Sequence, residues 1–484
     1  MPHIDFDLGA AARGEMIHEG FDPDFPPGTV EQIAAIRNRG PADLSAGAKD
    51  LRHLLWSSID NDSSRDLDQI EVAERVDGGI RVLVGIADVD TDVAIDSPID
   101  RHAASQTTSV YTGVKTFPML PEDLSTDLTS LNEDADRLAI VIEFVAGPDG
   151  GISNPAVYRA LVRNQAQLTY NGVGPWLEGS GEAPPKVAAS ADLQAQLKLQ
   201  DEAASALREQ RHRLGALDFD RVEAEPVVAN SHVREIRTRQ ANSATRLIED
   251  FMIAANEVMA QTLAAAGISS IRRVVKSPER WARIVELAAH YGYKLPPEPD
   301  SGALNEVLQK RRAEDPVHYP DVSLAVMKLM GPGEYVLSRA GEEGPGHFGL
   351  AVHDYTHSTA PNRRFADLVT QRLIKAAFEK TRAPYSDDQL DTIAKNCTLK
   401  EDAARKVQRA MQKRVAAVAL TGRVGETFDG VVTGNTPKGV FVRVLNPPVE
   451  GRIVHGEHGI DVGDRVRVKL INTDPQRGYI DFAR

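Results

Sequence analysis

The sequence predicts a mixed α/β (α+β) body followed by a small all-β domain of the OB type, with a short helical region in front. In the middle of the chain, runs rich in Val and Ile, such as residues 80–88, precede long stretches with helical periodicity, such as residues 191–213. Residues 422–484 instead alternate short strand-like runs with turns, as OB barrels do. Residues 1–48 are too short for a barrel, and residues 30–38 within them have a helical pattern.

The N-terminal region, residues 1–48, is therefore expected to be a small helical element. A proline-rich turn at residues 26–28 precedes the helical pattern of residues 30–38. A second helical pattern runs from residue 42 to residue 55 and leads into the body.

The body, residues 49–421, is expected to begin with strands and to continue with helices. The predicted strands are residues 71–75, 80–88 and 137–145, and the predicted helices are residues 191–213, 244–267 and 367–380. Residues 385–421 form a helical connector. On it, Arg405, Arg409 and Lys413 share one face, which is either an ordinary solvated face or a basic wall for a phosphate backbone.

Residues 422–484 make up the third expected domain. The predicted strands are residues 425–433, 439–444, 451–454, 465–471 and 478–482. So many short strands in so short a segment favour an OB-type barrel.

The composition argues against a secreted, membrane-spanning or purely charge-driven binding protein. The net charge of −14 argues against a non-specific nucleic-acid coat, which is usually basic. Cys397 is the single cysteine, so a disulfide framework and a cysteine zinc site are excluded. No stretch approaches the roughly 18 apolar residues of a membrane span, and no secretory signal is recognisable. We therefore expect a cytoplasmic protein that does not bind a membrane.

A cluster of carboxylates precedes the first strands of the body. Residues 58–70 contain Asp60, Asp62, Asp66 and Asp68, whose hard oxygen atoms suit Mg²⁺ or Mn²⁺ better than zinc. Asp66 and Asp68 point the same way if the segment is extended. With Asp60 they indicate a metal site of the kind that hydrolyses phosphodiesters. The alternative is a polar loop whose aspartates cap turns; an EF-hand is not indicated, because its glycine and closing glutamate are missing.

A second polar segment, residues 353–367, contains two adjacent arginines. Arg363 and Arg364 follow Pro361 and begin a predicted helix. Arginine binds phosphate oxygens through two parallel hydrogen bonds, and a helix N-terminus favours anions. The alternative is that these arginines cap the helix or pair with Asp367.

Together, these two segments resemble the signature blocks of the RNase II (RNB) family. Residues 58–69 resemble its acidic block, T/S-I-D and then R-D-x-D-D, and residues 355–367 resemble its Y-x-H-x-T-S-P-I-R-R-Y-x-D block. Further matches follow the order of the family at residues 85–89, 108–111, 117–121, 124–125, 130–132, 167–170, 247–252 and 347–350. The tail, at residues 425–430 and 438–442, resembles the S1 domain that follows in this family.

The resemblance implies a 3′→5′ hydrolytic exoribonuclease that degrades single-stranded RNA from its 3′ end to nucleoside 5′-monophosphates by a two-metal-ion mechanism. It implies an RNB catalytic domain over residues 49–421, an S1 OB fold over residues 422–484, and Mg²⁺, or Mn²⁺, as cofactor. Residues 1–48 stand where the family has two cold-shock domains, so a more open entrance for RNA is expected. We expect a monomer.

By position, Asp60, Asp66 and Asp68 match three metal-binding aspartates of the family. Gln69 stands at the fourth position, where its amide oxygen is a ligand without charge. The resemblance therefore implies weaker magnesium binding or a reliance on Mn²⁺. Asp68 and Arg363 match catalytic residues, and Arg363 is implied to contact the scissile phosphate.

Five other residues are implied to bind RNA. Tyr111 and Phe219 match aromatic residues that stack on 3′ bases, which suits an enzyme indifferent to sequence. Tyr170 and Glu249 match residues that hold the terminal nucleotide, and Arg364 is implied to contact phosphate or to support the loop. Core packing is the alternative for each aromatic residue.

A second class of function stays open, because Gln69 departs from the family pattern. In that alternative the chain is a catalytically weakened RNB-fold protein that binds RNA, and a third possibility is a phosphodiesterase for another substrate. His102, His347 and His357 are expected to be structural, since no metal-binding histidine spacing occurs.

Overall fold

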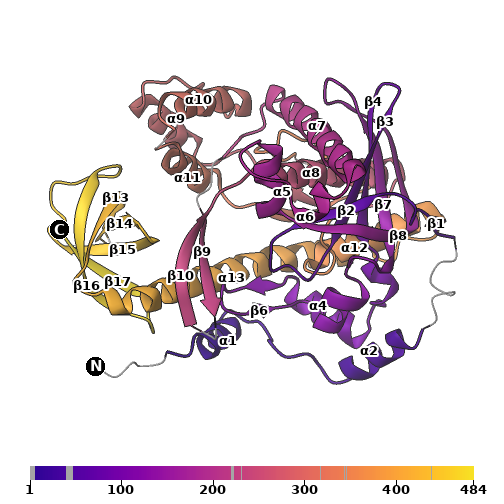
Figure 1. Ribbon diagram of the computed structural model, residues 1–484, viewed down its shortest axis with the longest axis horizontal. Coiled ribbons are helices and arrows are strands. Elements are labelled where there is room, and N and C mark those ends of the chain that lie inside the picture. The colour runs from indigo at the N-terminus through magenta and orange to yellow at the C-terminus, as the bar shows by residue number, and fades with distance from the viewer. Residues whose placement is uncertain are drawn as a thin grey trace.

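The computed structural model describes residues 6–39, 47–219, 223–229, 232–316, 318–342, 344, 346–437 and 439–484. A curved sheet forms the centre of the body (Figure 1). Its strand order is β1-β8-β2-β3-β4-β7, and β8 also pairs with β7, so the sheet returns on itself through this long strand. The strands are β1 (Lys49–Asp50), β2 (Trp56–Asp60), β3 (Gln69–Val76), β4 (Gly79–Ala87), β7 (Asp136–Ala146) and β8 (Ile152–Thr169).

Helices surround this sheet and bury one continuous apolar core that includes Trp56, Phe144 and Phe251. The helices of the body are α4 (Pro98–Gln106), α5 (Tyr170–Leu177), α6 (Pro185–Ala188), α7 (Ala191–Arg213), α8 (Ser243–Ala265) and α12 (Phe365–Glu379). Short helical turns lie at η1 (Val89–Thr91) and η2 (Asp123–Leu128). The predicted mixed α/β architecture is confirmed, and the three predicted strands correspond to β3, β4 and β7, although β4 ends one residue earlier than predicted.

A separate three-helix group has its own small core and lies beside the body (Figure 1). It consists of α9 (Trp281–His290), α10 (Ser301–Glu314) and α11 (Tyr319–Met330). Three strand pairs complete the body: β5 (Val110–Tyr111) with β6 (Thr116–Phe117), β9 (Glu223–Ala229) with β10 (His232–Arg239), and β11 (Ser270–Val274) with β12 (Glu334–Ser338).

The long helix α13 (Asp387–Leu420) joins the body to the C-terminal domain. Its first part packs in the body through Leu390, and its last turn packs in the C-terminal core through Leu420. The turn η3 (Thr421–Arg423) then leads into a closed barrel of order β13-β14-β15-β17-β16. The barrel strands are β13 (Thr427–Thr436), β14 (Gly439–Leu445), β15 (Pro448–His455), β16 (Arg465–Asp474) and β17 (Tyr479–Ala483). The predicted barrel and connector helix are thus confirmed.

The N-terminal region is helical, as predicted, in α1 (Leu8–His18) and α2 (Thr29–Arg37). The helix predicted over residues 42–55 is wrong where it is described. Residues 40–46 lie outside the described part, but Lys49 and Asp50 form β1 and pair in parallel with Ala160 and Leu161 of β8. Pairing with a distant strand here outweighs the local helical pattern.

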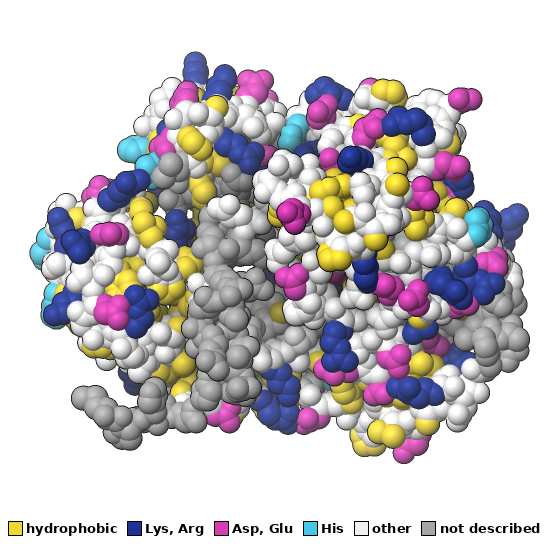
Figure 2. Space-filling model, viewed as in Figure 1, with side chains coloured by type: hydrophobic (Ala, Val, Ile, Leu, Met, Phe, Trp, Pro, Cys, Tyr) yellow, Lys and Arg dark blue, Asp and Glu magenta, His cyan; other side chains and the backbone are white. Residues whose placement is uncertain are grey.

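Within the part of the chain that the structure describes, no helix has both the length and the apolar surface required to cross a bilayer. The basic face of α13 is mixed in character. Arg405 pairs with Glu401 and Asp402, whereas Arg409 and Lys413 are exposed. On the face shown in Figure 2, positive and negative side chains are intermixed rather than gathered in a basic band.

Candidate active site

Two segments far apart in the chain meet at Asp68. One oxygen of this buried carboxylate accepts a hydrogen bond from the backbone amide of Asn362 at 3.1 Å. The other oxygen lies 3.3 Å from Nε of Arg363. The acidic segment before β3 and the arginine segment before α12 therefore form one site, as the sequence predicts.

The backbone around Asp68 is fixed by neighbouring elements. Leu67 is buried, donates its amide to Ser130 Oγ at 2.9 Å, and accepts the amide of Leu131 at 2.9 Å. The carbonyl of Asp68 accepts the amide of Ala87 at the end of β4 at 3.0 Å. Because Leu67 points into the core, Asp66 and Asp68 on either side of it both point toward the opposite side.

Asp60 and Asp66 complete the carboxylate group. Asp60, at the end of β2, accepts hydrogen bonds from the amide of Asn61 at 2.7 Å and from Ser64 Oγ at 2.8 Å. Asp66 accepts the hydroxyl of Tyr111 at 3.4 Å. Burial raises the pKa of Asp66, the positive charge of Arg363 opposes this rise, and the negative charge of Asp60 adds to it. The charges of these residues therefore act on one another.

Among these aspartates, Asp68 has the most strongly raised pKa. Burial raises its pKa to about 7, Arg363 lowers it, and Asp66 raises it further. Its Oδ2 atom is buried and accepts no hydrogen bond. Such a carboxylate oxygen, which has no hydrogen bond and lies near further negative charge, fits a divalent cation because a cation would offset the repulsion and bind this oxygen.

Hard oxygen donors of this kind suit magnesium. Among the described residues, no three or more His, Cys, Asp or Glu side chains are already arranged around a single point to hold a metal. Magnesium keeps several water ligands and is often held by only one or two carboxylates, so the donor set still fits it.

Gln69 begins β3 and is buried. Its Nε2 atom donates to the carbonyl of Ile59 in β2 at 3.5 Å. A ligand role for Gln69 stays a prediction. Asp62 accepts Asn171 Nδ2 of α5 at 2.6 Å, so its carboxylate is bound to a helix of the body.

The two arginines have different surroundings. The side chain of Arg363 is 47% exposed beside Asp68. Arg364 instead donates Nε and Nη2 to the two oxygens of buried Asp367 at 2.9 and 2.7 Å, while Asp367 also accepts the amide of Ala360 at 2.8 Å. Of the two interpretations of this pair, pairing with Asp367 is the one that the structure shows for Arg364. Its contact with RNA stays a prediction.

The β5–β6 hairpin carries Tyr111 to the carboxylates. Tyr111 is 40% exposed, and its hydroxyl reaches Asp66. The hairpin is also bonded to the arginine segment, because Ser109 donates its amide to the carbonyl of Arg363 at 3.0 Å and Phe365 donates its amide to Thr107 at 2.8 Å. Tyr111 is thus the aromatic residue that the structure joins directly to the predicted metal site.

The other residues implied to bind RNA lie on neighbouring elements. Tyr170 begins α5 and is half-buried, and Glu249 is exposed on α8. Phe219 is half-buried and packs against the core of α9–α11. The preceding residue, Asp218, is held by Arg312 at 2.6 Å. The contacts of these three residues with RNA stay predictions.

Two residues of the site were missed in the sequence. Asn362 supplies the amide for Asp68, and its side-chain oxygen accepts Thr129 Oγ at 2.6 Å. Glu71 is fully buried, and burial together with the charge of Asp60 raises its pKa well above the usual value. The available signal for Glu71 was its place between the apolar residues Ile70 and Val72, two positions after Gln69.

The histidines make structural contacts of the expected kind. His357 Nδ1 lies 2.8 Å from the hydroxyl of Tyr335, His347 Nδ1 accepts the amide of Leu350 at 3.1 Å, and the ring of His102 lies 4.6 Å from that of Phe25.

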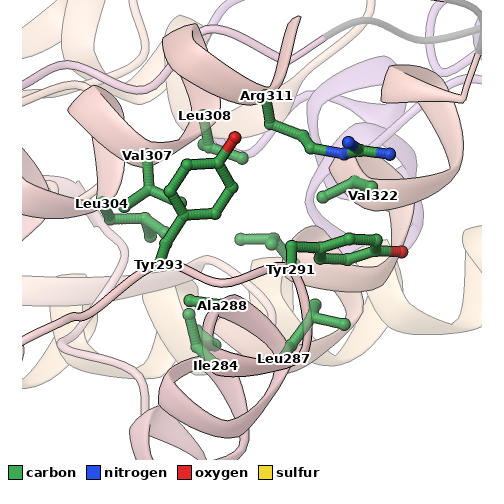
Figure 3. Close-up of a pocket in the computed structure, with 11 residues that line it drawn as sticks. Ile284, Leu287, Ala288, Tyr291, Tyr293, Leu304, Val307, Leu308, Arg311 and Val322 are labelled. Carbon is green, nitrogen blue, oxygen red and sulfur yellow. The ribbon is translucent and has the colours of Figure 1, made fainter. Parts of the chain in front are cut away.

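An apolar pocket lies within the three-helix group, and Tyr291, Tyr293 and Arg311 are among the residues that line it (Figure 3). Its volume of about 20 Å³ holds about one water molecule. None of the predicted site residues lines this pocket, so the candidate active site is the group around Asp68 and Arg363.

Comparisons with known proteins match both parts of the chain to described domains. The RNB domain matches residues 48–380, and the RNase II-type exonuclease C-terminal S1 domain matches residues 426–484. The chain is 32% identical over 501 residues to Ribonuclease R 1 of Lactococcus lactis, covering 95% of this chain and 59% of that protein. The chain thus spans about 60% of the length of the curated relatives it matches.

Solved structures share the fold. RNase R of Mycoplasma genitalium in complex with ribose-methylated single-stranded RNA superposes with a TM-score of 0.88 at 23% identity, over 99% of this chain and 78% of that one. Yeast Ssd1, a pseudonuclease, superposes with a TM-score of 0.71 at 16% identity, over 98% of this chain and 58% of that one. The fold alone therefore does not decide activity, and the side chains must.

Proposed function

The chain belongs to the RNB-domain family, and from that premise we propose that it is a hydrolytic 3′→5′ exoribonuclease acting on single-stranded RNA. The observation that carries the proposal is the contact of Arg363 with buried Asp68, beside Asp66 and Tyr111. It combines carboxylates for a cation, a guanidinium for a phosphate and an aromatic ring for a base.

In the proposed reaction, Arg363 binds the scissile phosphate and stabilises the charge that builds up as water attacks phosphorus. The bond from phosphorus to the 3′ oxygen of the preceding nucleotide breaks, so the released nucleotide keeps a 5′-phosphate. Asp60, Asp66 and Asp68 would hold magnesium or manganese, and we propose two ions. When bound, these ions supply an activated water and stabilise the leaving oxygen.

Tyr111 supports the choice of single-stranded RNA. Its exposed ring lies beside the carboxylates and offers a flat surface on which any base can stack. The S1 domain, residues 426–484, is proposed to hold RNA upstream of the site. We further propose that the protein acts as a monomer in the cytoplasm.

The alternative function is RNA binding with little or no catalysis. The reason to consider it is Gln69, which stands where the family pattern has a metal-binding aspartate. Its side-chain amide donates to the backbone of β2. The retained group of Asp60, Asp66, Asp68 and Arg363 argues for catalysis.

A ladder assay tests the proposed function. Incubation of 5′-labelled poly(A) RNA with the protein and Mg²⁺ or Mn²⁺ is expected to give products shortened one nucleotide at a time, with nucleoside 5′-monophosphates released, while the DNA analogue persists. Intact RNA under both metals, with binding retained, would establish the alternative instead. Internal cuts would contradict exonucleolytic action.

Restoring a carboxylate at position 69 is expected to strengthen the metal site. In Gln69→Asp, the added charge should lower the Mg²⁺ concentration that gives half-maximal activity. It should also reduce any difference between the activities measured with Mn²⁺ and with Mg²⁺. Titration of hydrolysis with each metal measures this. Saturation at the same low Mg²⁺ concentration in both proteins would show that Gln69 does not weaken the site.

A further inference from the structure

The first helix of the chain shares one apolar cluster with α13 and with the hairpin that carries Tyr111. We call residues 8–25 the N-terminal strap. Leu8, Ala12 and Met16 recur at helical spacing on one buried face of α1. They belong to one apolar cluster with residues of the β5–β6 hairpin and of α13, which are Val110, Phe117, Ala404, Val407, Met411 and Val415. Figure 1 shows α1 beside α13 and near β6.

Polar contacts fix the strap along its length. Glu15 pairs with Arg414 of α13 at 2.9 Å, and both side chains are mostly buried. Lys400 donates to the carbonyl of Gly20. The amide of Asp22 donates to Gln106 Oε1 at 2.9 Å, at the end of α4 that leads into the hairpin. The strap therefore has a defined position and is not merely collapsed onto α13.

The opposite side of the hairpin is bonded to the catalytic segments. Val110 and Tyr111 are adjacent in β5, so their side chains point to opposite faces. Val110 is fully buried in the cluster with the strap, while Tyr111 reaches Asp66. The hairpin is thus joined through Val110 to the cluster that holds the strap and through Tyr111 to the carboxylates.

We propose that the N-terminal strap is a positioning element for Tyr111, which sets the ring above the carboxylates so that the 3′ base of RNA stacks in register with the scissile phosphate. The binding part of this inference rests on the proposed function. Leu8, Ala12, Met16 and Glu15 are positioning residues, since they act through the hairpin and not on RNA.

Hydrogen exchange tests the structural part without RNA. Ala12→Asp places a charge in the buried face of α1, and Met16→Ala is a milder change that removes packing without adding charge. Ile17→Asp is the matched control, because Ile17 is 57% exposed on the same helix. In both strap variants, amides of residues 107–119 are expected to exchange about tenfold faster or more. Exchange in α7 should not change, and the control should behave as the wild type.

Stacking on RNA is measured with a single-stranded oligonucleotide that carries 2-aminopurine at its 3′ end, in EDTA so that no cleavage occurs. Wild-type protein and Ile17→Asp are expected to quench its fluorescence. The strap variants should reduce the quenching and raise the Kd for the oligonucleotide. The rise in Kd should not exceed the effect of losing one stacked base, which is about 5- to 150-fold. In the Tyr111→Ala background, the strap variants should add no further loss.

The outcomes separate the two proposals. Wild-type protein that neither binds nor cleaves RNA would refute the proposed function, while the exchange experiment would still decide whether the strap holds the hairpin. Unchanged exchange at residues 107–119 in both strap variants would contradict the proposal that the strap positions Tyr111. The proposal would also be contradicted if the strap variants weakened binding equally in the wild-type and Tyr111→Ala backgrounds. If Ala12→Asp does not fold, Met16→Ala alone decides.

Discussion

Asp68→Asn is expected to lower kcat by about 10³-fold or more while leaving RNA binding nearly unchanged, because metal ions supply several kcal/mol of transition-state stabilisation and each 1.4 kcal/mol is tenfold in rate. Asparagine keeps the shape of the side chain and can still accept the amide of Asn362. It removes the charge and directs a second donor group at Arg363, so it weakens cation binding at this position.

Single-turnover hydrolysis of labelled RNA, with fluorescence anisotropy for binding, measures the two effects separately. Asp77→Asn is the matched control, since Asp77 lies exposed in the turn between β3 and β4. A variant of Asp68 that retains more than about a tenth of the wild-type rate would show that this carboxylate is not part of the catalytic group.

The thermal stability of Asp68→Asn distinguishes lost chemistry from lost folding. The pKa of Asp68 is about 7 in the folded protein and lies above the value of about 3.9 in an unfolded chain. The charged form of Asp68 therefore destabilises the metal-free fold. This destabilisation is absent below about pH 4, where the carboxyl is protonated in both states, and it reaches its full size above about pH 7. In EDTA, the variant should melt at the same temperature as the wild type near pH 4 and at a higher temperature near pH 8.

Arg363→Gln is expected to lower kcat by about 10²- to 10³-fold, as removal of one preorganised donor to a developing charge does elsewhere. Arg363→Lys should recover only part of this loss, because a lysine ammonium lacks the planar fork that binds two phosphate oxygens. The melting temperature should fall less than in Arg364→Gln, since Arg363 is about half exposed and lies 3.3 Å from Asp68 without a hydrogen bond.

The neighbouring arginine is the control for this prediction. Arg364→Gln breaks the paired bonds to Asp367 and leaves a buried carboxylate without its partner, which costs about 3–5 kcal/mol of unfolding free energy. It should therefore appear mainly as a lower melting temperature. If Arg363→Gln were the variant that unfolds and kept its kcat when folded, the roles given to the two arginines would be reversed.

The sequence predicted which two segments lie together better than it predicted the contacts around them. Asp60, Asp66, Asp68 and Arg363 were found because two short motifs carry nearly all of the recognisable chemistry, and the structure brings them together. The backbone amide of Asn362 could not be found in this way, since any residue supplies an amide. For Arg364 the motif left two roles open, and only the distance to Asp367 separates them.

The fold shows the same limit. Residues 80–88 are recognisable because their strand is largely buried and rich in Val and Ile. Strand β8 was missed because its first half is largely exposed and only its second half alternates between buried and exposed residues. It pairs with β7 along one part and with β2 along another, so no single pattern describes it. Helix α1 had a usable signal in Asp7, which caps it by accepting the amide of Ala10.

The way α13 is packed has a consequence for how this protein can be divided. The helix has 34 residues and is about 50 Å long. Cys397 lies in the core of the body, Val407 in the cluster with the strap, and Leu420 in the core of the barrel. A fragment that ends near residue 421 would carry an apolar helix end into water, and a barrel that starts there would lack part of its interior. Truncation boundaries chosen at the edges of the two sequence domains are therefore expected to yield aggregating fragments, and the body, α13 and the barrel should be expressed as one piece.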